Sequence, residues 1–379
     1  MAKETPTQAP SKPSTPLSRA ILTPTPILTP GFIVPNHKST QSPSQITIAP
    51  EENTPTSTIF LPTNTPVRLA FISNMDGEIA LYTIISDGST LTRLTKQPML
   101  IMHPTWSPDS ARIAFEVCLG GSLSTDCPDG ESFDIYTVNS DGSNLTNLTN
   151  NEATDRFPSW SPDGEIAFSS DRSGKEEIYV MAADGSGVKQ ITDGLGRNDE
   201  PRWSPDGKWL AYHCTEEGTT SICIMPDGSP AQVIQIAGTY PVWSPINAEG
   251  GLRLAFHCWP NGESDICIAK PDGLGLINLT NSPEAEIDPT WSPDGRRIAY
   301  QSNRENHISI YKACVTCENS AEPIRLTSGE TNTNWPIWSP DGNWIAYQVG
   351  HELYVMLADG NGQRLLAEGF FGPAAWAGQ

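Results

Sequence analysis

The sequence contains no long apolar run and few basic residues. No stretch approaches the roughly 18 consecutive apolar residues that indicate a transmembrane helix, and residues 1–10 lack the apolar core of a signal peptide. Lys and Arg number 23 against 44 Asp and Glu, which gives a net charge of -21. Nucleic acids and anionic membranes attract basic surfaces, so this balance argues against both. We therefore expect no membrane span and no nucleic-acid partner.

Motifs for catalysis and for cofactor binding are also missing. The sequence has no Gly-x-Ser-x-Gly elbow and no phosphate-binding loop. Cys314-Val-Thr-Cys317 has no second cysteine or histidine pair at the spacing of a zinc site. Six histidines are dispersed over the chain, at His37, His103, His213, His257, His307 and His351. Since no nucleophile, base and orienting group can be assembled from these residues, we expect a non-enzymatic protein without cofactor or metal.

What the sequence does have is a tryptophan that follows a proline and recurs seven times. Successive copies lie 54, 43, 40, 48, 47 and 38 residues apart, at Trp106, Trp160, Trp203, Trp243, Trp291, Trp338 and Trp376. Five of them continue as Trp-Ser-Pro-Asp-Gly or nearly so. A repeat of about 45 residues is the period expected of propeller blades.

Each repeat is a succession of short apolar runs and turn signals. An apolar triplet such as Ile113 to Phe115 follows the tryptophan, and a second run such as Ile178 to Met181 comes later. An Asp-Gly pair then precedes a closing Leu-Thr or Ile-Thr. Such runs are typical of β-strands, and Asp-Gly is typical of tight hairpins. Because prolines interrupt most stretches that could form a helix, we predict an all-β fold with four antiparallel strands per blade.

The first repeat lacks its tryptophan strand, and the chain ends on one. Arg68 to Ser73, Glu78 to Ile85 and Leu91 to Thr95 supply three strands, whereas Pro373 to Trp376 supplies a fourth. An uncovered edge strand would leave N–H and C=O groups unpaired. We therefore predict that the carboxy-terminal strand becomes the innermost strand of blade one and closes a seven-bladed ring. A six-bladed ring is the alternative if the first unit forms no blade.

The recurring phrases Trp-Ser-Pro-Asp-Gly, Ile-Ala-Phe, Ile-Tyr-Val-Met, Asp-Gly-Ser and Leu-Thr resemble the repeat of TolB-type β-propellers, relatives of the WD-repeat propellers. The likeness covers residues 66–379. It implies a ring-shaped, extracytoplasmic platform that binds other macromolecules. The sequence shows neither the α/β domain that precedes the propeller in TolB nor the hydrolase domain of prolyl-peptidase relatives, so the resemblance does not supply their partners.

The eight cysteines fall into local pairs. The same nine-residue spacing recurs in successive repeats and straddles the hairpin between the second and third strands. Neighbouring strands bring side chains to about 5 Å, near the separation that a disulfide requires. We predict four disulfides, and hence export to an oxidising compartment, with these partners: Cys118 and Cys127, Cys214 and Cys223, Cys258 and Cys267, Cys314 and Cys317. Metal binding and free buried thiols are the alternatives.

Residues 1–65 form a segment of different composition, dominated by Thr, Pro and Ser. Such a segment cannot build a core, and its prolines favour extended conformations, so we expect an extended tail or linker before the propeller of residues 66–379. Apolar islands interrupt the tail and could add as strands to a neighbouring subunit, at Ile21, Leu22, Ile27, Leu28, Phe32, Ile33, Val34, Ile46, Ile48, Ile59 and Phe60. Head-to-tail addition that does not close would build a filament.

One repeat position varies in residue type. The residues directly before the prolines of the tryptophan strands are His103, Phe157, Glu200, Tyr240, Asp288, Trp335 and Gly372, and Asp199 stands beside them. Structural positions tend to look alike between repeats, whereas binding positions are free to differ. We predict that the six side chains and Asp199 form an acidic and aromatic rim at the channel mouth, in loops that lead into the blades. Such a rim suits a cationic group or a stacked sugar ring. A solvated ring of loops without a ligand is the alternative.

These observations favour an exported, non-enzymatic propeller that serves as a protein-interaction or structural module outside the cell or on its surface. A periplasmic location is the alternative. The partners would be proteins, including copies of the chain itself joined through the tail. The competing prediction is a carbohydrate-binding or carbohydrate-active propeller that uses the acidic and aromatic rim, with a glycan as its partner.

Overall fold

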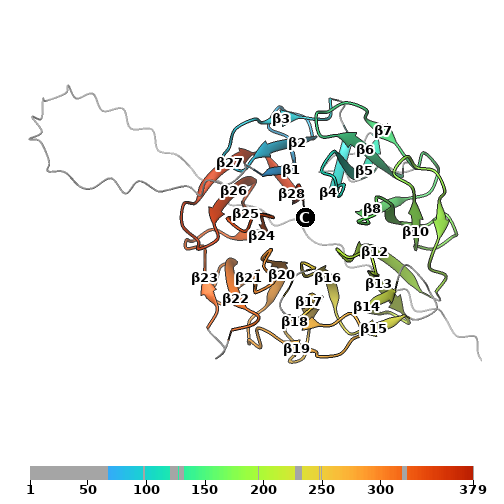
Figure 1. Ribbon diagram of the computed structural model, residues 1–379. Helices are drawn as coiled ribbons and strands as arrows, with labels where there is room; N and C mark the ends of the chain where they lie inside the picture. The colour runs from blue at the N-terminus through green and yellow to red at the C-terminus, as the bar shows by residue number, and fades with distance from the viewer. Residues whose placement is uncertain are drawn as a thin grey trace, which may run out of the picture. The chain divides into compact units, whose positions relative to one another are not determined.

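The computed structural model describes residues 67–96, 99–119, 127, 132–194, 196–226, 233–246, 248, 250–317 and 322–378. These residues form strands and turns only, arranged as seven four-stranded sheets around a ring (Figure 1). Within this part of the chain, no helix has the length and apolar character to cross a membrane. The predicted assembly tail, residues 1–65 with its apolar islands, lies outside the described residues.

Each blade is named here from its innermost strand outwards (Figure 1). Blade 1 consists of β28 (Phe370–Trp376), β1 (Arg68–Ser73), β2 (Ala80–Ile85) and β3 (Thr92–Arg93), and blade 2 of β4 (Met99–Trp106), β5 (Arg112–Leu119), β6 (Phe133–Asn139) and β7 (Thr146–Asn147). Blade 3 consists of β8 (Asp155–Trp160), β9 (Ile166–Ser170), β10 (Glu177–Met181) and β11 (Lys189–Gln190), and blade 4 of β12 (Arg197–Trp203), β13 (Trp209–Glu216), β14 (Thr219–Pro226) and β15 (Ile234–Ile236). Blade 5 consists of β16 (Thr239–Trp243), β17 (Leu254–Cys258), β18 (Asp265–Ala269) and β19 (Ile277–Asn278). Blade 6 consists of β20 (Glu286–Trp291), β21 (Arg297–Ser302), β22 (Ser309–Cys314) and β23 (Ile324–Arg325), and blade 7 of β24 (Thr333–Trp338), β25 (Trp344–Val349), β26 (Glu352–Leu357) and β27 (Arg364–Glu368).

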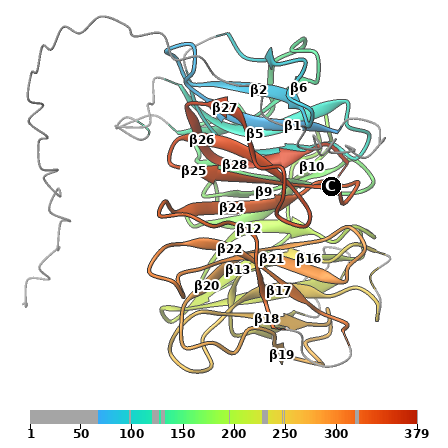
Figure 2. The same ribbon diagram turned by 90° about the vertical axis from the view of Figure 1, so that its left-hand side faces the viewer.

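The carboxy-terminal strand closes the ring, as predicted. β28 pairs antiparallel with β1, with Leu69 opposite Trp376, and so completes blade 1 (Figure 2). Seven blades are therefore confirmed, and the six-bladed alternative is excluded.

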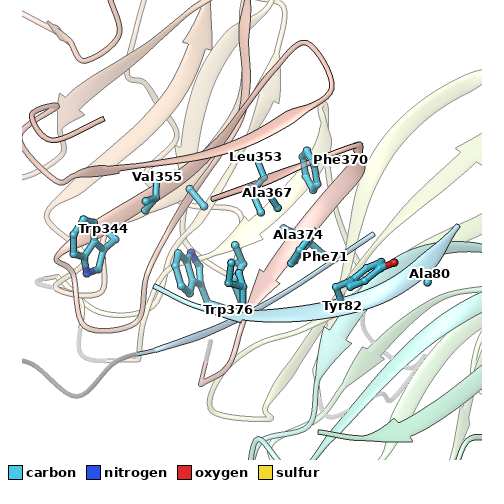
Figure 3. Close-up of a cluster of buried hydrophobic side chains, with 13 residues drawn as sticks. Phe71, Ala80, Tyr82, Trp344, Leu353, Val355, Ala367, Phe370, Ala374 and Trp376 are labelled. Carbon is cyan, nitrogen blue, oxygen red and sulfur yellow. The ribbon is translucent and has the colours of Figure 1, made fainter. Parts of the chain in front are cut away.

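A continuous core joins the last blade to the first (Figure 3). Trp376 and Phe71 are fully buried, and Trp344 of blade 7 packs in the same cluster. Burial of large aromatic side chains contributes most to such a core because the stabilisation grows with apolar area removed from water. The blades at the two ends of the chain are thus held together by side-chain packing as well as by strand pairing.

The apolar triplets form the second strand of each blade. Ile113, Ala114 and Phe115 of β5 are all fully buried. Side chains alternate between the two faces of a strand, so a continuous buried triplet requires both faces to be covered. Neighbouring blades cover both faces here, which explains why these strands lack the alternating pattern of a half-exposed sheet.

The tryptophans that define the repeat connect neighbouring blades. The indole of Trp291 donates a hydrogen bond of 3.1 Å to the carbonyl of Val242 in the preceding blade. Equivalent bonds run from Trp106 to Ala375, from Trp243 to Arg202 and from Trp376 to Ile337. These four tryptophans have a structural role, because each indole satisfies a carbonyl of the preceding innermost strand.

The Trp-Ser-Pro-Asp turns and the Leu-Thr phrases also have structural roles. Asp109 accepts hydrogen bonds from the hydroxyl of Ser107 and the amide of Ala111, and these bonds hold the pKa of its carboxyl below the ordinary value. The hydroxyl of Thr280 accepts from the amide of Ile266, which ties the end of a repeat to its own third strand. Asp109 thus stabilises its own turn.

The structure contains the four predicted disulfides. Cys214 and Cys223 lie on β13 and β14 with their Cα atoms 5.8 Å apart. They are diagonal rather than facing neighbours, because Cys214 stands opposite Ser221 and Cys223 opposite Tyr212. Cys258 and Cys267 repeat this diagonal arrangement one blade later.

Candidate functional site

Every innermost strand has the same backbone irregularity at the variable position. The residue before the proline has positive φ in all seven blades, at His103 (50°), Phe157 (55°), Glu200 (51°), Tyr240 (53°), Asp288 (52°), Trp335 (49°) and Gly372 (77°). In six blades the pairing register shifts there by one residue, a β-bulge; in blade 2, His103 and Pro104 together oppose Phe115. Positive φ is costly for bulky residues and is concentrated at functional sites.

The six non-glycine residues therefore lie inside strands, and the prediction that they belong to loops leading into the blades is wrong. The strands begin several residues earlier than the proline signal indicates, because the bulge accommodates the proline without ending the pairing. We refer to these residues below as the bulge ring: His103, Phe157, Glu200, Tyr240, Asp288 and Trp335.

The bulge ring is unevenly exposed. Tyr240 is 52% exposed and Trp335 39%. His103, Glu200 and Asp288 are half-buried, whereas Phe157 is only 8% exposed. The two large exposed aromatics thus come from blades 5 and 7, and the carboxylates of the ring come from blades 4 and 6.

Side chains of the preceding blade hold the bulges of blades 3, 5 and 6. The amide of Phe157 donates to Glu116 Oε2 at 2.8 Å, and the amide of Tyr240 donates to His213 Nε2 at 2.7 Å. The amide of Asp288 donates to His257 Nε2, also at 2.7 Å. A bulge leaves a ladder donor unpaired, so an acceptor from the preceding blade satisfies a group that would otherwise be costly to bury.

These three acceptors were not predicted from the sequence. Glu116, His213 and His257 all follow directly after the apolar triplet of their repeat, and this common position was the available signal. Ser169, Gln301 and Gln348 occupy the same position in other blades, so the position is polar in six of the seven repeats. His213 and His257 appear isolated in the sequence because each of them contacts a residue of the following blade.

The first cluster of the site surrounds Glu116, which is fully buried. Its carboxylate lies 3.1 Å from His103 Nδ1 and 3.0 Å from the guanidinium of Arg156. Burial alone would raise the pKa of Glu116, but the hydrogen bond from His103 and the charge of Arg156 hold it below the ordinary value. The ring of Phe157 packs on His103, with centroids 4.7 Å apart, so Phe157 is packed in this cluster.

The second cluster surrounds Tyr240. Its ring lies between two buried histidines, with centroid distances of 5.2 Å to His213 and 5.0 Å to His257. Burial lowers the pKa of His257 to about 4, so His257 is neutral at pH 7. Its Nε2 is already occupied by the amide of Asp288 and is not available as a general base.

Carboxylates border Tyr240 on both sides. Glu200 Oε2 lies 3.8 Å from His213 Nδ1, and Asp288 Oδ1 lies 3.9 Å from His257 Nε2. Burial raises the pKa of Asp288, and burial with the charges of Glu200 and Asp288 raises the pKa of the Tyr240 hydroxyl. Asp199 is paired with Arg197 at 2.7 Å, so its charge is largely compensated. In this cluster Glu200 and Asp288 lie beside histidines, and Asp288 Oδ2 also accepts a hydrogen bond from the side-chain amide of Gln301.

No metal site emerges from this geometry. Across the described ranges, no group of three or more His, Cys, Asp or Glu side chains is placed to hold an ion. The arrangement of Tyr240, Glu200 and Asp288 instead offers an aromatic face with negative charge on either side. Such a surface attracts organic cations such as ammonium or guanidinium groups.

Two segments of the chain, residues 119–239 and 231–377, match the family model of the TolB beta propeller domain. Among curated proteins, a TolB homolog of Chlorobium luteolum is 28% identical over 143 residues, which is 29% of this chain and 33% of that protein. The uncharacterized peptidase YuxL of Bacillus subtilis is 31% identical over 130 residues, which is 27% of this chain and 20% of that protein. The alignments thus span a third or less of these relatives.

The crystal structure of TolB from Acinetobacter baumannii aligns with a TM-score of 0.52 at 20% identity, over 79% of each chain. Likeness at this identity concerns the fold. The repeats, the closed ring and the family match, which covers most of the chain, agree with one another. The chain belongs to the TolB β-propeller domain family.

Proposed function

We propose that this protein is a non-enzymatic protein-interaction module that binds a cationic segment of a partner protein at Tyr240. Membership of the TolB propeller family supports an interaction role. The observation that carries the proposal is that Tyr240 is 52% exposed although its backbone is held in a strained conformation by His213. A large aromatic side chain presented in this way has a cost in the free protein, and contact with a ligand would offset it.

The charge around Tyr240 supports a cationic ligand. Glu200 and Asp288 border the ring, and their nearest titratable partners are His213 and His257. A Lys or Arg side chain over Tyr240 would gain a cation–π contact and two carboxylate partners. The net charge of -21 adds long-range attraction for a basic partner.

Peptide binding measured by isothermal titration calorimetry tests the proposal. The probe is a set of peptides of equal length that carry Lys, Arg, Gln or Glu at matched positions. We expect the Lys and Arg peptides to bind and the Glu peptides not to bind. Glu200→Gln and Asp288→Asn should each weaken the binding about 5- to 10-fold, and Tyr240→Ala should weaken it further.

Asp193→Asn is the matched control, because it removes the same charge from a side chain that is 92% exposed and follows β11, the outermost strand of blade 3. It should leave the affinity within about 2-fold of the wild type. Equal weakening by all three charge variants would show that net charge alone drives binding and would reject the site. Binding of neutral oligosaccharides on a glycan array, lost in Tyr240→Ala and Trp335→Ala, would favour the carbohydrate alternative instead.

We further propose that the protein acts outside the cell or at the cell surface, since four disulfides are typical of exported proteins. Assembly into filaments through residues 1–65 is the more specific version of this proposal. Light scattering of the full chain and of a chain without residues 1–65 tests it. High-mass species that disappear with the tail would support assembly, and a monomeric full chain would reject it.

A further inference from the structure

The four disulfides differ in how accessible their sulfur atoms are. Cys214 and Cys223 are 9% and 7% exposed, and Cys258 and Cys267 are 6% and 3% exposed. Cys118 is fully buried on β5, whereas its disulfide partner Cys127 is half-buried. Thiol–disulfide exchange requires a thiolate to approach one sulfur along the S–S axis, so the bonds of blades 4 and 5 are shielded while the blades remain folded, and attack on the Cys118–Cys127 bond is limited to the half-buried Cys127.

The Cys314–Cys317 disulfide lies at the surface. Cys314 is the last residue of β22 and is half-buried, whereas Cys317 is exposed in the turn that follows. The bond joins two cysteines that are three positions apart in the sequence and does not link two strands. Its reduction therefore removes no cross-strand link from the blade.

The surroundings of Cys314 favour a thiolate. Arg297 stands directly opposite Cys314 in the β21–β22 pairing; its side chain is 49% exposed and lies 3.5 Å from the carboxylate of Asp294, a surface pair that solvent screens. Lys312 lies two residues before Cys314 and thus on the same face of the strand, and its ammonium donates to the carbonyl of Ala358 at 2.6 Å. By contrast, Cys258 stands opposite the carboxylate of Asp265. Positive charge stabilises a leaving thiolate and so speeds exchange, and negative charge does the reverse.

We propose that Cys314 and Cys317 form a thiol–disulfide exchange site that reacts with an external thiol while the propeller stays folded. The external thiolate attacks Sγ of Cys317 and forms a mixed disulfide, the Cys314–Cys317 bond breaks, and Cys314 leaves as a thiolate that takes up a proton. A second external thiol attacks the mixed disulfide, forms an external disulfide and releases Cys317 as a thiol. Two thiols are oxidised, and the protein disulfide gains two electrons and two protons.

Differential alkylation of the full chain tests the proposal. The native protein is equilibrated with graded concentrations of reduced glutathione, alkylated, and analysed by peptide mass spectrometry. We expect Cys314 and Cys317 to become labelled at a glutathione concentration at least about 10-fold lower than the other six cysteines. A glutathione adduct on Cys317 should appear at early times, with circular dichroism unchanged.

Two variants sharpen the test. Arg297→Gln should slow the exchange at Cys314–Cys317 several-fold, whereas Arg93→Gln, which removes a guanidinium paired with Glu78 in blade 1, should not change it. Simultaneous labelling of all eight cysteines, or labelling that appears only when the circular dichroism signal is lost, would overturn the proposal. The double variant Cys314→Ser, Cys317→Ser gives a further control. The proposal would also be overturned if glutathione adducts formed on its other cysteines as fast as they form on Cys317 in the wild type.

Discussion

The indole of Trp106 donates a hydrogen bond of 2.9 Å to the carbonyl of Ala375, a residue 269 positions further along the chain. Trp106 ends the innermost strand of blade 2, and Ala375 belongs to the strand that completes blade 1. The bond therefore joins the first complete repeat to the last residues of the chain. Closure of the ring depends on these carboxy-terminal residues, and the first prediction tests this dependence.

We predict that Trp376→Ala lowers the free energy of unfolding by about 3–5 kcal/mol, because Trp376 is fully buried in the core between blades 7 and 1 and donates to the carbonyl of Ile337. Trp335→Ala is the matched control, since this tryptophan is 39% exposed on the bulge ring and should cost less than about 1 kcal/mol. Denaturant unfolding followed by circular dichroism measures both. Equal costs would contradict closure by Trp376.

The second prediction concerns the stability of the protein at acid pH. His257 has a pKa of about 4 in the folded protein, compared with 6.5 for an unperturbed histidine. Between these values the unfolded chain binds more protons than the folded protein, so stability falls as the pH falls from 6.5 to 4. The loss from this one histidine amounts to about 3 kcal/mol.

His257→Gln should remove this component of the pH dependence. Gln occupies the equivalent repeat position at Gln301 and Gln348, and its amide oxygen can accept from the amide of Asp288 without titrating. Unfolding free energies measured at several pH values between 4 and 7 compare the two proteins. A variant that loses stability as steeply as the wild type would show that another group controls the acid response.

Glu116 provides a third prediction. Glu116→Gln keeps the shape of the side chain but leaves Arg156 without its buried counter-charge, and we expect a loss of about 2–4 kcal/mol. The control is Glu78→Gln, which removes a half-exposed carboxylate paired with Arg93 and should cost less than about 1 kcal/mol. The comparison is made by urea unfolding at pH 7. Similar values for the two variants would mean that the buried cluster contributes no more than a surface pair.

The fourth prediction compares two glycines with similar backbone angles. Gly185 and Gly174 have φ of 85° and 94°, but a Cβ on Gly185 would lie 2.7 Å from the carbonyl oxygen of Leu148, whereas a Cβ on Gly174 would meet no atom within 4 Å. Gly174→Ala should cost about 1–2 kcal/mol from the backbone angle alone. Gly185→Ala should cost at least about 1 kcal/mol more. Thermal unfolding of the two variants checks the difference, and equal melting temperatures would contradict it.

Most of the architecture was predictable because it depends on local patterns that repeat. The Trp-Ser-Pro-Asp-Gly phrase and the apolar triplets predicted the strands, and the incomplete first repeat predicted that Trp376 would pair with blade 1. The cysteine pairs were predictable for the same reason, since the spacing of Cys214 and Cys223 recurs at Cys258 and Cys267.

The candidate site was only partly predictable. The variability of the position before each proline drew attention to residues such as Tyr240 and Asp288, but it did not indicate their place inside bulged strands. His213 and His257 were missed as site residues because the hydrogen bonds that they accept span 27 and 31 residues. Nothing in the local sequence says which residue of the next blade a side chain will reach.

The sequence by itself determined the number of blades, the strands in each blade and the strand that closes the ring, because short-range patterning and turn chemistry specify these features repeat by repeat. Only the tertiary structure decided which side chains meet between blades. The contacts of Tyr240 with His213 and His257, and those of Glu116 with His103 and Arg156, depend on how successive sheets are rotated around the ring and on bulges that shift the register.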